Sequence, residues 1–96
     1  MSKLKANNIS PYVGLAQRAN AILYGEDIIA ERVKLAKVVL IDASATDKYK
    51  DRLKSKIKNC PVFVTDDLKT ALHKDGVYAV AVTNDGLANA IIELLR

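Results

Sequence analysis

Three short and almost uninterrupted apolar runs divide this chain, and stretches with helical periodicity lie between them. The runs are VVLI at residues 38–41, PVFV at 61–64 and YAVAV at 78–82. A continuous β-branched and leucine run is typical of a strand covered on both faces, so we expect residues 38–41 to form a central strand. Pro61 is tolerable as the first residue of a strand. Helices that alternate with such strands indicate a layered α/β sandwich.

The first third of the chain predicts two helices around a short strand. Ser10 and Pro11 suit an N-cap and a first-turn proline of a helix that continues to about residue 22. Residues 21–24 are expected to form a brief edge strand before Gly25, and a second helix covers roughly residues 26–36. The expected apolar side of this second helix consists of Ile28, Ile29, Val33 and Ala36.

Three further helices are predicted after the central strand. Residues 42–47 offer several N-cap candidates for a helix that runs to about Asn59, and its stripe of Tyr49, Leu53 and Ile57 should face the sheet. Asp66 or Asp67 would cap a short helix, and Asp75-Gly76 would end that segment as a turn. Residues 83–86 start the last helix, whose broad apolar face consists of Leu87, Ile91, Leu94 and Leu95, with Ile92 widening it.

The size of the chain fits one compact unit. It has 96 residues, half of them hydrophobic, so we expect a single domain over residues 1–96 and a monomer. A run of about 18 apolar residues is missing, and the first residues lack the apolar stretch of a secretory signal. We therefore expect a cytoplasmic protein that does not enter a membrane.

The residue types that carry most enzymatic chemistry are sparse. One cysteine, Cys60, and one histidine, His73, exclude an intrachain disulfide and a Cys/His zinc cage. Cys60 is expected to be a small buried hydrophobe, and His73 the C-terminal cap of a helix. The chain has no Gly-rich nucleotide-binding motif and no signature of a catalytic triad. We therefore predict no catalytic residue, no metal site and no cofactor, and we expect the protein not to be an enzyme.

The charge balance is compatible with a polyanionic partner. Fifteen Lys and Arg residues outweigh eleven Asp and Glu residues, giving a net charge of +4. The third predicted helix concentrates this charge in two rows beside its apolar stripe. Either the rows form an electrostatic footprint for phosphates, or their aliphatic stems cover the edges of the packed stripe on a solvated helix. The rows are Lys48, Arg52 and Lys56, and Lys50, Lys54 and Lys58.

Several ordered blocks resemble a known family over nearly the whole chain. These blocks are Gly14-Leu15-Ala16 with Arg18-Ala19, then Gly25, then Asp42-Ala43-Ser44, and finally residues 81–88, AVTNDGLA. Together they resemble the kink-turn RNA-binding ribosomal-protein family, especially its bacterial YlxQ-type members. The resemblance implies a three-layer α/β/α sandwich, with a small mixed sheet of about four strands and helices on both faces. It also implies a small non-catalytic protein that recognises structured RNA, such as ribosomal or kink-turn-like RNA.

The resemblance also implies where RNA would bind. Kink-turn binders of this family have Gly, a small residue, Asn and Glu at the start of a helix, with Lys three residues later, and a second contact before the last strand. The glycine permits close approach of the backbone, and a helix N-terminus attracts phosphate. On this chain the second contact falls on residues 73–77. The implied positions are Gly25, Glu26, Asp27, Ile28 and Glu31, with Lys74, Asp75, Gly76 and Val77.

The chain departs from the family pattern where guanine would be read. Asp27 stands in place of Asn, Ile28 in place of Glu, and Glu31 in place of Lys. A carboxylate has no donor for guanine O6 or N7, although acids in a first helical turn complement the helix dipole. The attraction for phosphate should then come from cations near the Gly25 loop. The candidates are Arg18, Lys34, Lys37 and Lys74.

Two functional hypotheses follow from these residues. The first is RNA binding through the Gly25 loop and residues 73–77 as one surface. The alternative is a protein-interaction module that keeps the fold but has lost kink-turn RNA recognition, with protein partners in translation or transcription. Asp27 and Glu31 support this alternative, together with the apolar breadth of the last helix at Ile92 and Leu95.

Overall fold

The computed structural model describes residues 9–66, 68–72, 74 and 76–96. In this part of the chain, no helix is both long and apolar enough to cross a membrane. The elements are α1 (Ser10–Arg18), β1 (Ile22–Tyr24), α2 (Glu26–Glu31), the 3₁₀ helix η2 (Val33–Leu35), β2 (Val38–Asp42), α3 (Asp47–Lys56), β3 (Val62–Thr65), α4 (Leu68–Leu72), β4 (Ala79–Val82) and α5 (Asp85–Leu95).

The four strands form one mixed sheet in the order β1-β4-β2-β3. β2 runs parallel to β3 and antiparallel to β4, and β4 is also antiparallel to β1. All residues of β2 are buried, as expected of a strand between two neighbours with helices on both faces. The prediction of a central strand at residues 38–41 is therefore confirmed, and so is the edge position of the short strand before Gly25.

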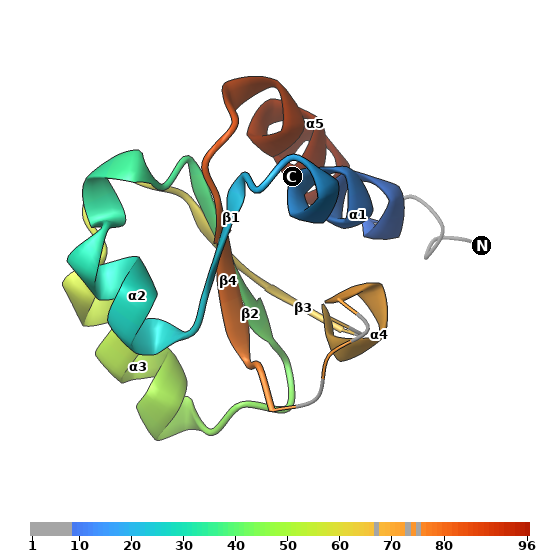
Figure 1. Cartoon of the computed structure of the whole chain (residues 1–96). Coiled ribbons are helices and arrows are strands. Elements are labelled where there is room, and N and C mark those ends of the chain that lie inside the picture. Colours follow the sequence, from blue (N-terminus) through green and yellow to red (C-terminus); the bar gives the residue numbers. More distant parts are fainter. Residues whose placement is uncertain (1–8, 67, 73, 75) are drawn as a thin grey trace.

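Helices cover both faces of the sheet, and the three-layer α/β/α sandwich is confirmed (Figure 1). α1, α4 and α5 lie on one face, while α2 and α3 lie on the other. Successive side chains of a strand point to opposite faces. Val38 and Leu40 of β2 therefore pack in the cluster under α1, α4 and α5, while Val39 and Ile41 pack in the cluster under α2 and α3.

The first helix is displaced and shorter than its predicted range. Ile9 occupies the N-cap position and Ser10 is already helical, so the prediction of Ser10 as the N-cap is wrong by one residue. Pro11 lies in the first turn as expected. The helix ends at Arg18 because Asn20 adopts the left-handed conformation, with φ of 56°. The amides of Asn20 and Ala21 then bond back into the last turn, which is a Schellman ending that periodicity alone does not reveal.

The predicted second helix is interrupted at Arg32. α2 ends at Glu31 and the chain continues as the 3₁₀ helix η2. Ile29 is fully buried, whereas Ile28 is 41% exposed, so the prediction that Ile28 lies on the apolar side is wrong. Adjacent residues of a helix point about 100° apart, and in this short helix Ile29 takes the position facing the sheet.

The start of α3 is capped by Thr46, whose hydroxyl accepts a bond of 3.1 Å from the amide of Tyr49. Thr46 is one of the predicted candidates. The helix ends at Lys56, earlier than the predicted Asn59, because Ile57 is already extended. Leu53 and Ile57 are buried, and half-buried Tyr49 packs beside them, as the stripe predicted.

Asp42, another predicted cap of α3, serves a different helix. Its Oδ1 accepts a bond of 3.0 Å from the amide of Leu68, the first residue of α4, and its Oδ2 accepts bonds from the amide and hydroxyl of Ser44. The prediction of a cap within residues 42–47 is confirmed by Thr46, whereas Asp42, one of the candidates, caps α4 instead. Of the predicted caps of α4, Asp66 is exposed and Asp67 lies outside the described residues.

The last helix begins in the predicted segment, because the side chain of Asn84 accepts a bond of 2.9 Å from the amide of Leu87. Ile92 and Leu95 are half-buried and pack against the core, so core packing accounts for the apolar breadth of α5. Cys60 is also half-buried rather than fully buried, and burial raises the pKa of its thiol. The predicted cap His73 lies outside the described residues.

Candidate functional site

Gly25 forms the turn between β1 and α2, and its backbone conformation requires glycine. Its φ is 87°, and it occupies the N-cap position of α2. The amide of Gly25 donates to the carbonyl of Ala79 at 3.0 Å, and its carbonyl accepts from Ile29 at 3.0 Å. A Cβ at this position would meet nothing within 4 Å. The backbone turn is therefore open to close approach from outside.

The segment that leads into β4 lies beside this turn. The ammonium of Lys74 lies 4.9 Å from the ring centroid of Tyr24, the last residue of β1. Gly76 has a φ of 78° and is exposed, while Val77 is half-buried against the core. Antiparallel pairing of β1 with β4 explains this placement, since the end of β1 meets the start of β4. Asp75 lies outside the described residues.

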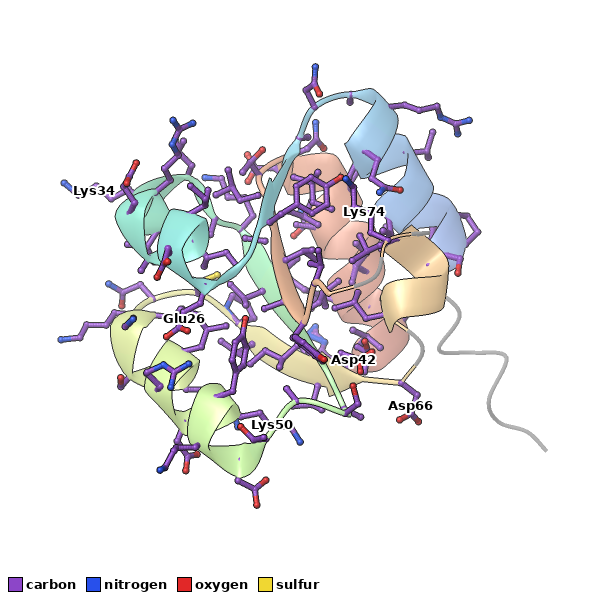
Figure 2. All side chains as sticks on the ribbon, turned by 60° about the horizontal axis from the view of Figure 1, so that its bottom comes forward. Glu26, Lys34, Asp42, Lys50, Asp66 and Lys74 are labelled. Carbon is purple, nitrogen blue, oxygen red and sulfur yellow. The ribbon has the colours of Figure 1, made fainter. Side chains whose placement is uncertain are left out.

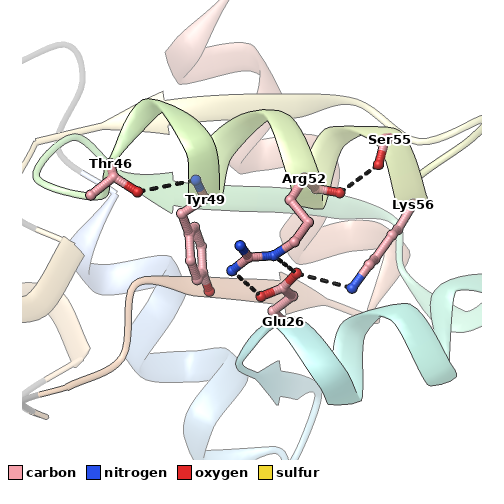
Figure 3. Close-up of polar contacts among 6 residues, drawn as sticks. All are labelled: Glu26, Thr46, Tyr49, Arg52, Ser55 and Lys56. Atoms are coloured by element: carbon pink, nitrogen blue, oxygen red, sulfur yellow. Dashed lines mark hydrogen bonds and ion pairs between the residues drawn. The ribbon is translucent and has the colours of Figure 1, made fainter.

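Glu26, the first residue of α2, faces α3 (Figure 3). Arg52 holds its carboxylate through two hydrogen bonds of 2.5 and 2.8 Å, and Lys56 adds one of 3.0 Å. The side chain of Glu26 is 13% exposed. These cations lower the pKa of Glu26 to about 2, with the Arg52 bonds as the main cause. Glu26 is therefore charged and already paired within the protein.

The other implied positions of α2 are on its outer surface. Asp27, Ile28 and Glu31 are all exposed. Asp27 and Glu31 are four residues apart and therefore lie on the same side of the helix. The carboxylate of Glu31 lies 4.0 Å from Arg32 Nε, and both side chains are more than half exposed. This surface of α2 thus presents two acids and one apolar side chain.

The expected cations are divided between the two ends of the sheet. Lys74 lies over the ring of Tyr24, the residue before Gly25. Lys37 precedes β2 at the opposite end, where its ammonium lies 3.7 Å from Asp85. Figure 2 shows Lys34 and Lys74 on separate sides of the molecule. Arg18 is exposed in the last turn of α1, before β1 begins. The structure therefore does not bring these four residues together around Gly25.

Other side chains that the family resemblance did not implicate lie at the same end of the sheet as Gly25. Tyr78 is 36% exposed, and its ring packs edge-on against Tyr49 with centroids 6.1 Å apart. The guanidinium of Arg52 lies 5.5 Å from the Tyr49 ring. Lys50 donates to the carbonyl of Ala43, just beyond β2, at 3.2 Å. We name the surface formed by Gly25, Lys74, Gly76, Val77 and Tyr78 the Gly25 end of the sheet.

The signals for these residues were partly present in the sequence. Tyr78 directly follows the implied contact segment, but the apolar run 78–82 made it look like a strand residue. Arg52 and Lys56 belong, with Lys48, to one of the predicted cation rows, and the structure pairs both with Glu26. In the described part of the chain, no group of three or more His, Cys, Asp or Glu side chains could hold a metal ion.

Comparison with known sequences shows the family of the chain. No family model matches the chain. The curated "RNA-binding protein YlxQ" of Bacillus subtilis (strain 168) is 32% identical over 92 residues, with 88% of this chain and 92% of the relative covered. The chain therefore belongs to the YlxQ family.

Two solved structures share the fold. A protein with unknown function from Bacillus halodurans C superposes with a TM-score of 0.83 at 24% identity, with 93% of this chain and 97% of that chain covered. The Giardia lamblia 15.5kD RNA binding protein superposes with a TM-score of 0.72 at 20% identity, with 99% and 88% covered. At these identities the likeness concerns the fold alone.

Proposed function

We propose that this protein binds structured RNA without catalysing a reaction, and that the Gly25 end of the sheet contacts the RNA. The family relative named as an RNA-binding protein supports the type of ligand. The observation that carries the location is the contact of the Lys74 ammonium with the ring of Tyr24, the residue before the open Gly25 turn. An accessible backbone turn, an ammonium group and the partly exposed Tyr78 all belong to this end of the sheet.

Each of these groups has a defined role in the proposal. The ammonium of Lys74 attracts a phosphate and releases its counterion. The Gly25 turn lets the RNA backbone approach without a side chain in the way. The exposed part of the Tyr78 ring offers a surface on which an unpaired base stacks, and such contacts contribute about 1–3 kcal/mol per base.

We further propose that the preference for kink-turn-like RNA is weak. Asp27 and Glu31 present acceptors where the family pattern places Asn and Lys, so they cannot donate to guanine O6 or N7. We therefore expect kink-turn-like RNA to bind mainly through phosphates and stacked bases. The affinity should exceed that for an unrelated structured RNA by a small factor.

The test is RNA binding over a series of salt concentrations. A kink-turn RNA and an unrelated structured RNA of equal length are titrated with the protein and with a Lys74→Gln variant. Affinity should fall with salt, and the variant should reduce the slope of log K against log salt by about 1, the value for one lost phosphate contact. Lys54→Gln is the matched control, because Lys54 is exposed in the last turn of α3 and should leave the slope unchanged. No binding at the lowest salt concentration refutes the proposal.

The second candidate function is a protein-interaction module, and one observation favours it. Ile28 is 41% exposed on α2, flanked on the same helix by exposed Asp27 and Glu31. Charged residues around an exposed apolar side chain suit a protein partner with a complementary basic surface. If the protein binds no RNA in the salt series, this second function becomes the favoured one.

A further inference from the structure

Four lysines line one pocket at the end of the sheet where β2 and β3 begin. The pocket has a volume of about 470 Å³ and is formed by the residues that lead into β2 and β3. Ligand pockets commonly have volumes of about 300–1,000 Å³. We call it the lysine pocket, and its lining consists of Val33, Lys34, Ala36, Lys37, Lys56, Lys58 and Asn59.

The topology places the lysine pocket at the opposite end of the sheet from Gly25. β1 and β2 run in the same direction, because both are antiparallel to β4. Gly25 follows the last residue of β1, whereas Lys37 precedes the first residue of β2. The pocket therefore opens at the other end of the sheet, and only Lys56 reaches from it to Glu26, the residue after Gly25.

Acidic side chains neutralise the pocket incompletely. Lys37 has Asp85 at 3.7 Å, but Asp85 is 80% exposed and such surface pairs are weak. Lys56 bonds to Glu26, yet Arg52 already holds both oxygens of that carboxylate. The one carboxylate thus serves two cations. With Lys34 and Lys58 added, the lining keeps an excess of positive charge.

The lining chemistry selects phosphate groups over other ligands. The four ammonium groups and the amide of Asn59 are all donors, and a phosphate chain offers several acceptor oxygens with negative charge. The lining residues include no aromatic ring on which a base could stack. Val33 and Ala36 add a small apolar surface. Recognition of consecutive phosphates explains such a lining, whereas recognition of a nucleobase does not.

We propose that the lysine pocket is an anion site that binds consecutive phosphate groups, supplied either by an RNA backbone or by a free oligophosphate. This proposal does not depend on RNA binding at the Gly25 end. A bound phosphate chain competes with Asp85 for Lys37 and contacts the other lysines of the lining.

The first experiment titrates the ¹⁵N-labelled full chain with inorganic tripolyphosphate and follows the amide signals. We expect the largest shifts at residues 33–37 and 56–59. The double variant Lys34→Gln/Lys58→Gln should weaken binding about tenfold, since each exposed charge contact contributes up to a few-fold in affinity. The control Lys48→Gln/Lys54→Gln removes the same charge from exposed α3 positions outside the pocket and should change affinity little.

The second experiment distinguishes the source of the phosphates. The salt dependence of RNA binding is measured for the same two double variants. If the RNA backbone fills the pocket, the pocket variant should lower the slope by about 2, and the control should not. If the pocket variant leaves the salt slope of RNA binding unchanged, while tripolyphosphate shifts the amide signals of the pocket, the ligand is a free oligophosphate.

The proposal is overturned if tripolyphosphate causes no shifts at the pocket and the RNA slope is unchanged. It is also overturned if the pocket variant and the control weaken binding equally, because the effect would then come from net charge. If the parent protein binds no RNA at all, the proposed RNA function fails, while the tripolyphosphate titration still decides the pocket.

Discussion

Arg52 in α3 holds Glu26 in α2 through two hydrogen bonds, from Nε to Oε2 at 2.5 Å and from Nη2 to Oε1 at 2.8 Å. Lys56 adds a third bond at 3.0 Å. Two bonds from one planar guanidinium fix the orientation of both side chains. The contact therefore joins the two helices that cover one face of the sheet, and it directs the first acid of α2 towards α3.

The Glu26 contact should make stability depend on pH in the acid range. The pKa of Glu26 is lowered from 4.5 to about 2 in the folded state. A lowered pKa means that the stabilisation is complete above about 4.5 and is lost as the pH falls towards 2. Glu26→Gln should reduce the free energy of unfolding near neutral pH by about 1 kcal/mol, because the cations are half exposed. Denaturant unfolding of parent and variant should converge at acid pH.

A matched control separates this effect from general loss of charge. Glu93→Gln removes a carboxylate whose bond to Arg96 is 3.2 Å long and whose side chain is 72% exposed. This variant should change the free energy of unfolding by less than about 0.5 kcal/mol at either pH. If Glu93→Gln and Glu26→Gln behave alike, the bonds to Arg52 do not stabilise the fold.

The backbone at Gly25 should resist a side chain although space is available. Its φ of 87° is unfavourable for any residue with a Cβ, while no atom lies within 4 Å of that position. Gly25→Ala should therefore lower the free energy of unfolding by about 1–2 kcal/mol. Gly14→Ala is the matched change, because Gly14 is helical with equally open space, and it should raise stability by about 0.5–1 kcal/mol. In thermal unfolding, the midpoint temperature should fall for Gly25→Ala and rise for Gly14→Ala. Changes in the same direction would contradict the conformational argument.

Replacement of Asp42 should destabilise the fold more than replacement of the exposed Asp66. It is 5% exposed, and its two oxygens accept bonds from Leu68 and from Ser44. Asp42→Ala leaves these donors without that acceptor and should lower the free energy of unfolding by about 2–3 kcal/mol. Asp66→Ala, at an exposed position nearby in sequence, should cost less than about 0.5 kcal/mol. The denaturant midpoints of the two variants measure this difference in stability. Similar midpoints would exclude the capping role of Asp42.

The layers of the fold could be predicted because they depend on local patterns. Buried strands such as residues 38–41 are continuous apolar runs, and stripes such as Leu53 and Ile57 repeat with the helical period. Helix ends were harder, since they depend on single backbone conformations and on distant partners. Asn20 ends α1 by adopting a positive φ, and Asp42 caps a helix that begins 26 positions later. A pattern within one segment contains neither fact.

The proximity of the two segments proposed as the site was predictable, but the distribution of the charges was not. The resemblance implied that the Gly25 loop and residues 73–77 form one surface, and the pairing of β1 with β4 places Lys74 beside Tyr24. The cations Lys34 and Lys37 could not be placed in this way. Their positions depend on where η2 ends and on the direction of β2, which are properties of the folded sheet.

The departure of α2 from the family pattern gives a last prediction. The change Asp27→Asn, Ile28→Glu, Glu31→Lys introduces an amide and an ammonium donor at exposed positions beside the Gly25 turn. Because the fold around the turn is unchanged, this triple variant should bind a kink-turn RNA at least about tenfold more tightly than the parent, while its affinity for an unrelated RNA rises less. Glu93→Lys, on the other face of the sheet, adds the same two units of positive charge and is the control. Affinities at one fixed salt concentration decide the outcome. An equal gain in the control would show that net charge, and not the side chains beside Gly25, governs RNA binding.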